Sequence, residues 1–518
     1  MTVNRLLFLV CSFIVVFDNL VFWDKLFQRI DFFEASGFGF TVGFTSLFFA
    51  ILYIILVLFS NKITLKVFLS VILLVSAIIG YFSKLGVVFD QFMLANIIDN
   101  IKEQNTKEAL ELLSIPLVIH ISIFGFVPIA LLWIVKIKRQ PFLIESRNRV
   151  LITLAVVTVC VMLIWANMKS VTYFGRENRD LRYFTNPLFV INAGYSYVDD
   201  VYFPNHKESF KVIGDDAVIE DKQKKTVGIF IVGETARADR FALNGYDKDT
   251  NPRLSKRNLI NFSNTASCGT STAYSVPCMF SFLGKDDYSP QKADKQSNVL
   301  DVLKKAGVKV FWLDNNSSCK GVCTRIESSN MLSENKLDIA MLDNLKNTID
   351  KQDSDVLIVL HSLGSHGPRY YRRYPKAFEQ FTPVCENTPE KCSYEEVNNA
   401  YDNSILYTDY LIDSSIQLLK DNYADSFVFY ASDHGESLGE KGVYLHGLPY
   451  IIAPEAQTHV PMLAWFSDKK SATVDKPSSH DNISHSLLGL FKVKTKVYNP
   501  SLDLFKIIRI RVNAINLR

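Results

Sequence analysis

The sequence predicts five helical membrane spans followed by a soluble α/β domain. Three observations lead to this fold class. Apolar runs dominate the first third of the 518 residues, and the remainder has the mixed composition of a soluble globular protein. In that remainder, short apolar runs alternate with stretches of helical periodicity. Six of the eight cysteines also fall there, in three close pairs. The net charge of +3 is too small to indicate a nucleic-acid partner.

Five apolar segments have about the ~17–25 residues that cross a bilayer as a helix. They are Leu6–Trp23, Phe40–Ser60, Leu65–Phe82, Ile115–Val135 and Val150–Met168. The first segment resembles a signal peptide, but it lacks a small-residue cleavage site and further spans follow it. We therefore expect it to be retained as a span. His120, inside the fourth segment, is either functional or, as we expect, bonded to a neighbouring helix.

Charges in the connecting loops predict the orientation of the spans. The loops on one side are basic, and those on the other side hold more acids than bases. The basic side carries Arg5, Lys62, Lys66, Lys136, Lys138, Arg139, Arg147 and Arg149. Because the basic side stays in the cytoplasm, five spans place the soluble domain outside. The cysteine pairs agree, since disulfides form in oxidising compartments.

The composition divides the chain into a transmembrane domain at 1–168, a linker at 169–225 and a soluble domain at 226–518. The linker interleaves aromatic and basic residues, which suits a segment resting on lipid headgroups. These residues are Tyr173, Phe174, Arg176, Arg179, Arg182, Tyr183 and Phe184. Between the third and fourth spans, Phe89–Leu113 is amphipathic and is either an interfacial helix or a spacer. The basic, apolar tail Ile507–Arg518 receives no assignment.

The soluble domain reads as apolar strands separated by helices, which predicts a largely parallel sheet. The helices include Asn298–Ala306 and Tyr394–Lys420. The strands are Val227–Val232, Val308–Leu313, Val356–Leu360, Phe427–Tyr430 and Val460–Phe466. Ligands of such sheets bind at the carboxyl ends of the strands. Glu234, Asp433 and His434 fall at those ends.

The six cysteines of the soluble domain pair by proximity. Local pairs in an oxidising compartment indicate disulfides. We expect Cys268–Cys278, Cys319–Cys323 and Cys385–Cys392. A zinc site on Cys319 and Cys323 is the alternative, but no second Cys/His pair stands at zinc-finger spacing.

Four hydroxyl side chains lie between Cys268 and Cys278, and they are Thr270, Ser271, Thr272 and Ser275. A hydroxyl becomes a good nucleophile when a metal or a base removes its proton. Together with two carboxylates and an imidazole at the strand ends, it would complete a tetrahedral zinc site. Spacing alone leaves the choice among the hydroxyls open, and a polar loop closed by a disulfide is the simpler alternative.

Further polar residues stand where they would serve a phosphoryl group. His366 and His446 each precede a glycine, and either a second metal or a phosphate oxygen would suit them. Asn316 and Lys320, close to Cys319, would supply an amide and a cation. The alternative is that Asn316 and Lys320 are ordinary solvated loop residues.

Five motifs together resemble the lipid A phosphoethanolamine transferases, a family that includes the mobile colistin-resistance enzymes. The motifs are Gly233-Glu-Thr-Ala-Arg-Ala-Asp-Arg240, Cys268-Gly-Thr-Ser-Thr-Ala-Tyr-Ser-Val-Pro-Cys278, His366-Gly-Pro368, Ser432-Asp-His-Gly-Glu-Ser437 and Tyr444-Leu-His-Gly447. The resemblance implies an alkaline-phosphatase/sulfatase-like periplasmic domain on the inner membrane of a Gram-negative cell.

The resemblance also implies the roles of the site residues. Thr272 would be the nucleophile, and Glu234, Thr272, Asp433 and His434 would hold one zinc ion. The family's positions for phosphate, substrate and a possible second zinc would be matched by His366, His446, Asn316, Lys320 and Glu436.

The implied reaction moves phosphoethanolamine from phosphatidylethanolamine to Thr272, with release of diacylglycerol, and then to an acceptor. The acceptor is a lipid A phosphate, a core sugar, or another periplasmic glycan or protein, and we expect a monomer. Three alternatives stay open. A phosphoglycerol transferase of the lipoteichoic-acid type is disfavoured by the cysteine pairs, a sulfatase-class hydrolase would release its intermediate to water, and a pure interaction module would need no zinc.

Overall fold

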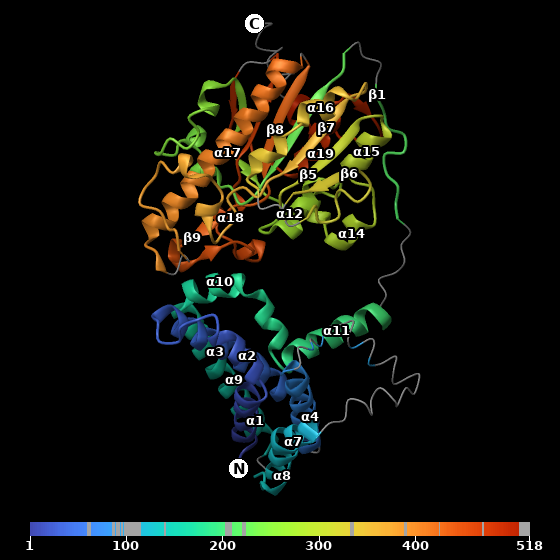
Figure 1. Ribbon diagram of the computed structural model, residues 1–518. Coiled ribbons are helices and arrows are strands. Elements are labelled where there is room, and N and C mark those ends of the chain that lie inside the picture. The colour runs from blue at the N-terminus through green and yellow to red at the C-terminus, as the bar shows by residue number, and fades with distance from the viewer. Residues whose placement is uncertain are drawn as a thin grey trace. The chain divides into compact units, whose positions relative to one another are not determined.

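The computed structural model describes residues 1–59, 64–84, 115–138, 141–202, 210–219, 224–316, 318–331, 336–387, 391–423, 425–468 and 471–506, with single positions at 87, 89, 94 and 97. The chain forms two compact units, Met1–Lys207 and Glu208–Arg518, whose helices and strands are labelled in Figure 1. Most of the predicted interfacial helix Phe89–Leu113 and the tail Ile507–Arg518 lie outside the described residues. The domain boundaries at 168 and 225 stay a prediction.

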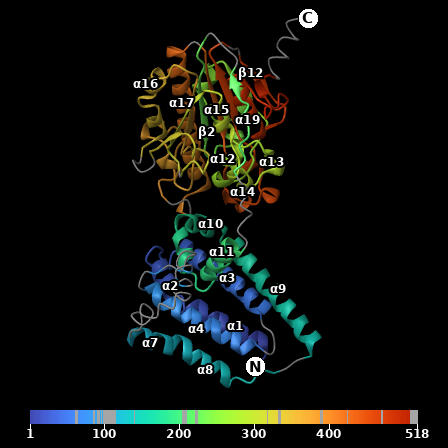
Figure 2. The same cartoon turned by 90° about the vertical axis from the view of Figure 1, so that its right-hand side faces the viewer.

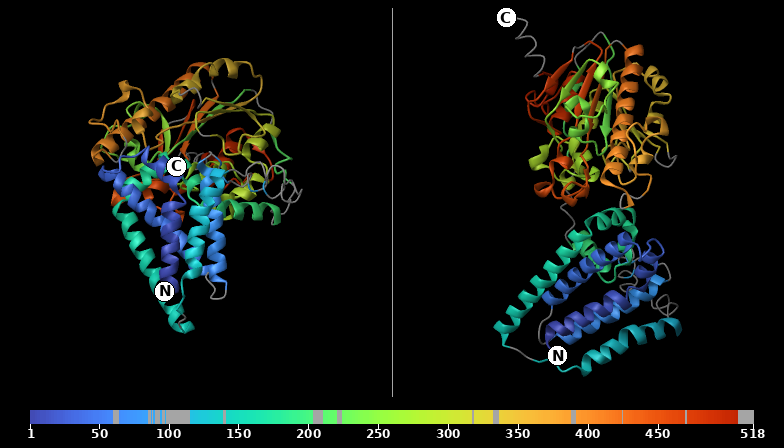
Figure 3. Two further views of the ribbon diagram at one scale, coloured as in Figure 1. Left: turned by 60° about the horizontal axis from the view of Figure 1, so that its bottom comes forward. Right: turned by 90° about the vertical axis from the view of Figure 1, so that its left-hand side faces the viewer.

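The first unit is helical, and its long helices lie side by side (Figure 3). Both α1 and α9 pack along α3, and α4 packs along the helices of the fourth predicted span. The elements are α1 (Val3–Phe17), α2 (Leu20–Phe27), α3 (Ala35–Phe59), α4 (Leu65–Lys84), α7 (Ile115–Ile121), the π-helical turn η1 (Ser122–Phe126), α8 (Val127–Ile134), α9 (Phe142–Ala166), α10 (Met168–Glu177), the 3-10 helix η2 (Arg179–Phe184) and α11 (Leu188–Tyr202).

Within the described residues, four unbroken helical segments are long and apolar enough to cross a membrane. They are Ala35–Val57, Leu65–Lys84, Ile115–Ile134 and Leu143–Ala166. The pair α1 and α2 passes the same test together but is bent by 52°. Counted as one span, this pair completes the five spans that the sequence predicts.

A buried polar cluster accompanies the bend in the first span, which the sequence predicted as the single segment Leu6–Trp23. Asp18 and Asn19, at the break between α1 and α2, are almost fully buried. Asn19 Nδ2 donates to the carbonyl of Asn186, and the amide nitrogen of Asn186 donates to Asn19 Oδ1, both at 2.8 Å. Asn186 Nδ2 also donates to the carbonyl of Ser76 at 2.6 Å. Neighbouring protein groups thus satisfy the side-chain amide of Asn19 at the helix break.

The last span begins earlier than the predicted segment Val150–Met168. Arg149 pairs with Glu145 one turn away at 2.6 Å, so the charged residues join the first turns of α9. In the fourth span, His120 Nδ1 lies 3.5 Å from the ammonium of Lys84 on α4. This contact fits the expected bond between His120 and a neighbouring helix.

The second unit is built on a sheet of eight strands, counted over the described residues, in the order β12-β3-β11-β8-β2-β7-β5-β6. From β8 to β6 all neighbours are parallel, while β11 runs antiparallel to both β8 and β3. The strands are β2 (Val227–Gly233), β3 (Leu259–Phe262), β5 (Lys309–Asp314), β6 (Glu327–Asn330), β7 (Val356–His361), β8 (Ser426–Ser432), β11 (Met462–Phe466) and β12 (Ala472–Val474).

Helices cover both faces of this sheet. The unit's α-helices are α12 (Thr272–Met279), α13 (Gly284–Asp287), α14 (Pro290–Asp294), α15 (Val299–Lys305), α16 (Leu345–Asp350), α17 (Tyr394–Asn422), α18 (Glu455–Thr458) and α19 (Asp481–Leu490). Short strands β1 (Val218–Ile219), β4 (Thr265–Ala266), β9 (Ser437–Leu438), β10 (Tyr444–Leu445), β13 (Ser478–Ser479) and β14 (Val493–Lys494) form the pairs β1-β14, β9-β10 and β4-β13.

The two cores follow from the alternation of side chains along each strand. In β2, Ile229 and Ile231 point into the core that contains α16 and α17, and Phe230 and Val232 point into the core that contains α15 and α19. Figure 2 shows these helix pairs on opposite sides of the sheet. Because both faces are covered, the strands are continuously apolar, which is why they are recognisable in the sequence.

The five predicted strands and both predicted helices are present, and the α/β fold class is confirmed. The sheet is less uniformly parallel than expected, because the predicted strand Val460–Phe466 becomes the antiparallel β11. Three sheet strands were not foreseen, namely β3, β6 and β12. β6 contains only exposed polar residues, so no apolar run marks it.

The structure joins Cys268 to Cys278, Cys319 to Cys323, and Cys385 to Cys392 as disulfides. The alternative of a zinc site on Cys319 and Cys323 is therefore not supported. Cys11 and Cys160 are free and buried in the first unit.

The long helix α17 begins with a capping box, which gives a test of local stability. Ser393 Oγ accepts from the amide of Glu396 at 3.2 Å, and the Glu396 carboxylate accepts from the amide of Ser393 at 2.6 Å. Ser393→Ala should destabilise this first turn by about 1 kcal/mol, or roughly fivefold in amide hydrogen exchange measured on the full chain. Ser271→Ala is the control, because that N-cap side chain makes no capping bond to the described first turn of α12. Equal exchange rates for Ser393→Ala and the unsubstituted chain would contradict the capping role.

Candidate active site

The first site residue, Glu234, follows directly after the buried strand β2. The next residue, Thr235, has φ of 55°, which a β-branched side chain adopts only under strain of about 1–3 kcal/mol. Tyr401 on α17 holds this turn, because its hydroxyl donates to the carbonyl of Thr235 at 2.7 Å and accepts from the amide of Arg237 at 3.0 Å. The strained turn directs Glu234 across the end of the sheet.

The second pair, Asp433 and His434, follows the neighbouring strand β8. Asp433 Oδ1 accepts from the amides of Thr235 and His434 at 3.2 and 2.7 Å. Asp433 Oδ2 is buried and has no hydrogen-bond partner among the described residues. His434 Nδ1 donates to the carbonyl of Gly435 at 2.9 Å, which leaves the Nε2 lone pair as an acceptor or metal ligand.

The hydroxyl side chain of Thr272 comes from the first residue of α12. Ser271 before it is extended, so the helix begins at Thr272. Ser275, one turn on, accepts from the amide of Gly269 at 3.1 Å and donates to the carbonyl of Asp433 at 2.5 Å. It thereby ties the disulfide loop to the end of β8.

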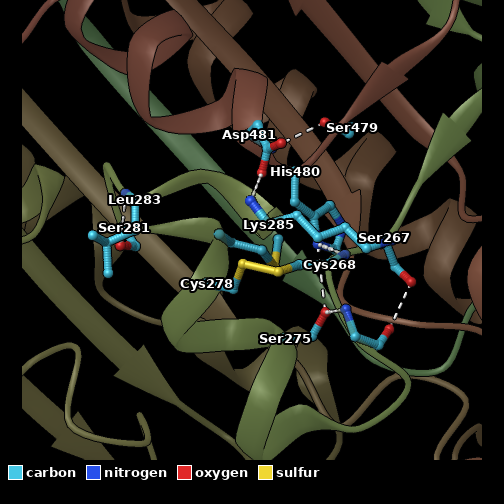
Figure 4. Close-up of a disulfide and its surroundings, with 12 residues drawn as sticks. Ser267, Cys268, Ser275, Cys278, Ser281, Leu283, Lys285, Ser479, His480 and Asp481 are labelled. Atoms are coloured by element: carbon cyan, nitrogen blue, oxygen red, sulfur yellow. Dashed lines mark hydrogen bonds between the residues drawn. A yellow bond between two sulfur atoms is a disulfide. The ribbon is translucent and has the colours of Figure 1, made fainter. Parts of the chain in front are cut away.

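His480 is a second residue that joins the disulfide loop to the end of β8, and the sequence did not predict it. Its Nδ1 accepts from the amide of Cys268 at 3.0 Å, and its Nε2 donates to the carbonyl of Ser432 at 2.9 Å. Burial lowers the pKa of His480 to about 3, so the ring is neutral at pH 7. Figure 4 shows His480 beside the Cys268–Cys278 disulfide. A single histidine before a helix gives no sequence signal for this role.

The four predicted ligands converge at the carboxyl ends of β2 and β8. His434 Nε2 lies 3.4 Å from each of three oxygens, on Glu234, Asp433 and Thr272. Thr272 Oγ1 donates to the Glu234 carboxylate, with distances of 3.0 and 3.2 Å to its two oxygens. One nitrogen and three oxygens thus face a common point in a buried site.

The electrostatics of these carboxyls favour a bound cation. Burial raises the pKa of Asp433 to about 7. Burial and the neighbouring charge of Asp433 raise the pKa of Glu234 to about 7 as well. Two buried carboxylates close together are costly unless a positive charge compensates them. The arrangement is therefore suited to a metal ion.

Two more histidines border the same point. Donor atoms of Glu234, His434 and His446 all lie within 4.8 Å of one another, a spacing compatible with a metal ion. His446 Nδ1 lies 3.2 Å from the buried carboxylate of Glu436, and the rings of His366 and His446 meet edge to face at 5.7 Å. The structure thus brings together His366, His446 and Glu436, three of the five expected additional residues, and their separate roles stay a prediction.

The segment that carries His366 rests directly on Glu234. Ser365 donates its amide to the carbonyl of Glu234 at 3.0 Å. Gly364 has φ of 50°, and a Cβ there would lie 2.7 Å from the same carbonyl, so only glycine fits. Asp338, which the sequence analysis missed, accepts from the amides of Leu363 and Gly364 at 2.8 and 2.9 Å.

Asn316 and Lys320 occupy different surroundings. Asn316 Nδ2 donates to Glu234 Oε2 at 2.7 Å and to the carbonyl of Ser362 at 3.0 Å. Lys320 lines a cavity of about 240 Å³ together with Ala273 and Pro277 of α12. Asn316 is thus engaged with a proposed metal ligand, and the phosphate-binding roles of both residues stay a prediction.

Comparisons with known proteins assign the chain to a family. A model of the sulfatase family matches residues 226–493, and a model described as phosphoethanolamine transferase EptA/EptB matches residues 48–202. Phosphoethanolamine transferase EptA of Escherichia coli K12 is 38% identical over 471 residues, which are 84% of each chain. Phosphatidylethanolamine transferase Mcr-1 of Escherichia coli is 37% identical over 523 residues, 93% of this chain and 94% of that one.

Solved structures agree with this assignment. The integral membrane lipooligosaccharide phosphoethanolamine transferase A of Neisseria meningitidis is 31% identical with a TM-score of 0.61, covering 96% of this chain and 97% of that chain. The C-terminal periplasmic domain of phosphoethanolamine transferase EptC from Campylobacter jejuni is 46% identical with a TM-score of 0.53, covering 57% and 97%. The chain therefore belongs to the EptA/EptB family of phosphoethanolamine transferases, as an integral membrane enzyme with a sulfatase-like catalytic domain in the periplasm.

Proposed function

We propose that the chain transfers phosphoethanolamine from phosphatidylethanolamine to lipid A, or to a related acceptor of the cell envelope, through a covalent intermediate on Thr272. The description of Mcr-1 as a phosphatidylethanolamine transferase supports the donor, and the lipooligosaccharide activity named for the Neisseria relative supports the acceptor. The observation that carries the proposal is the set of donor atoms that surrounds the Thr272 hydroxyl.

The residues present fit a zinc ion. Tetrahedral zinc with nitrogen and oxygen ligands at about 2.0–2.2 Å separates its ligand atoms by roughly 3.3–3.5 Å. His434 Nε2 lies 3.4 Å from the oxygens of Glu234, Asp433 and Thr272. The buried Asp433 Oδ2, which lacks a partner among the described residues, is one of these donors. We therefore assign Glu234, Thr272, Asp433 and His434 as the holders of one zinc ion.

Bound there, zinc would lower the pKa of the Thr272 hydroxyl and offset charge on the phosphoryl group. In the first step, Thr272 Oγ1 attacks the phosphorus atom, the bond to the diacylglycerol oxygen breaks, and phosphoethanolamine stays on Thr272. Thr272 gives up one proton and the leaving oxygen takes one up. In the second step, an acceptor oxygen attacks the same phosphorus atom and the bond from phosphorus to Thr272 Oγ1 breaks. Thr272 Oγ1 takes up one proton, and the acceptor oxygen gives one up.

The remaining residues would hold the donor and the acceptor. Lys320 supplies a cation for the transferring phosphoryl group. His366, His446 and Glu436 form either a phosphate-binding group or a second zinc site. Asn316 orients Glu234 through the bond already described, which adds a role to the one that the family resemblance implies.

Asn316→Ala tests this orienting role. Loss of its amide leaves Glu234 Oε2 without that bond, so zinc affinity and transfer should both fall about 10–100-fold. Chelator competition on the purified full chain measures the affinity. Asn315→Ala is the matched control, because Asn315 Nδ2 donates to Asp338 and not to a zinc ligand. Slower transfer with unchanged zinc affinity would instead assign Asn316 to the phosphate.

The proposed function is tested by mass spectrometry of lipid A from a host with and without this chain. Lipid A should gain phosphoethanolamine only when the chain is present, and labelled phosphatidylethanolamine should yield diacylglycerol in equal amount. Free phosphoethanolamine without acceptor modification would indicate a hydrolase. Modification of a core sugar or of a protein, with lipid A unchanged, would correct the acceptor.

A further inference from the structure

A seven-residue apolar loop stands beside the active site without a role in the chemistry described above. It runs Leu448-Pro-Tyr-Ile-Ile-Ala-Pro454 and contains the 3-10 helix η12 (Tyr450–Ile452). The side chain of Ile451 is 94% exposed and that of Ile452 is 66% exposed. The two isoleucines are adjacent and form a contiguous exposed apolar patch, the kind of feature that marks interaction sites on protein surfaces.

The base of this apolar loop is fixed to segments that carry residues of the candidate site. It begins two residues after His446, and the Leu448 carbonyl accepts from the hydroxyl of Thr270 at 2.6 Å. The Leu448 amide donates to Gln457 Oε1 at 3.3 Å. Gln457 is fully buried, and its amide nitrogen donates to the carbonyl of Leu445 at 2.9 Å. The loop therefore presents its tip from a rigid frame that also carries the candidate metal ligand His446.

Charged groups near the tip suit a lipid surface. The ammonium of Lys285 lies 3.0 Å from the ring centre of Tyr450. Tyrosine and lysine next to aliphatic side chains are typical of protein segments at the membrane–water boundary. Lys285 is followed by the exposed Asp286 and Asp287, so both signs of charge are present to pair with the two charges of a zwitterionic headgroup.

We propose that the apolar loop inserts Ile451 and Ile452 into the surface of the bilayer that holds the zwitterionic phospholipid substrate. The proposal rests on the proposed function, since it serves to place the active site at the level of the donor headgroup. A stable protein interface buries about 800 Å² on each partner, and two isoleucines are too small for that. They suffice for shallow insertion into a bilayer, because the spanning helices of the same chain already hold it at the membrane.

Insertion is measured on the full chain reconstituted in nanodiscs of phosphatidylethanolamine and phosphatidylglycerol. A single environment-sensitive fluorophore is attached at Ile451→Cys, and its quenching by acyl-chain spin-labelled lipid is recorded. Emission should fall by at least about half, as expected for a shallow interfacial position. Val218→Cys is the matched control, since Val218 on β1 is an aliphatic side chain that is 57% exposed. It should show little quenching.

Two results would overturn the proposal. Equal quenching at the two positions would show that the loop has no special contact with lipid. Blue-shifted emission at Ile451→Cys without lipid quenching would show that protein, either another segment of this chain or a second molecule, covers the tip.

An activity measurement separates this proposal from the proposed function. The double variant Ile451→Ser and Ile452→Ser should lower transfer from bilayer phosphatidylethanolamine at least about tenfold, with unchanged zinc content. Turnover of a soluble short-chain phosphatidylethanolamine should stay unchanged. Equal loss with both donors would contradict membrane insertion. Absence of transfer by the unsubstituted chain would reject the proposed function. The quenching result would still show whether the apolar loop contacts lipid.

Discussion

Thr272→Ala is expected to lower phosphoethanolamine transfer by at least about 10³-fold, because it removes the nucleophile and one of the four proposed zinc ligands. Diacylglycerol release and acceptor modification should disappear together. Thr272→Ser should retain part of the activity, since its hydroxyl can take the same place. Both products are measured by mass spectrometry with the purified full chain and labelled donor.

Ser271→Ala is the matched control for this result. Ser271 precedes Thr272, and its hydroxyl makes no capping bond to α12 within the described part of the chain. It should therefore keep near-normal transfer. Thr270→Ala is a less clean control, because Thr270 Oγ1 donates to the carbonyl of Leu448. Transfer retained by Thr272→Ala would reject a covalent mechanism through this residue.

Asp433→Asn should weaken zinc binding by at least about 100-fold and abolish transfer, because it removes a buried negative charge from the ligand set. The amide oxygen can still accept from Thr235 and His434, so the loop after β8 should keep its shape. Elemental analysis after chelator competition measures the loss. His434→Ala should give a similar or larger loss.

Asp409→Asn is the control for this second result. Asp409 is also fully buried, its pKa is also raised to about 7 by burial, and it also accepts from two backbone amides, those of Arg253 and Leu254. It lies on α17 and belongs to no metal cluster found among the described residues. Equal zinc loss in Asp409→Asn and Asp433→Asn would show a general destabilisation. Unchanged zinc in Asp433→Asn would overturn the ligand assignment.

Much of the fold and the centre of the site follow from local sequence patterns. Both faces of the sheet are covered, so its central strands are apolar runs that end abruptly in polar residues. Parallel neighbours end at the same edge, which is why Glu234 and Asp433, 199 positions apart in the sequence, were expected to meet. The choice of Thr272 over Thr270 and Ser271 was not available from spacing. Only the family resemblance ranked it, and the bond from its hydroxyl to Glu234 now supports that ranking.

The parts that the sequence did not predict depend on contacts between distant segments. Tyr401 holds the turn at Thr235, and Asn186 holds the break beside Asn19. Such bonds join a side chain to a distant backbone group, so no periodicity or spacing marks them. The bend of the first span and the orienting bond from Asn316 to Glu234 escaped prediction for the same reason. Antiparallel β11 is as apolar in sequence as the parallel strands of the sheet, because the composition of a strand follows its burial and not its direction.

The most direct measurement is tandem mass spectrometry of the peptide spanning Cys268–Cys278, taken from the full chain during turnover with phosphatidylethanolamine. A phosphoethanolamine mass shift should appear on Thr272 and should be absent in Thr272→Ala. It should also disappear when acceptor is added in excess, because the second step consumes it. A shift on Thr270 or Ser271, or transfer without any adduct in this peptide, would contradict the covalent mechanism through Thr272.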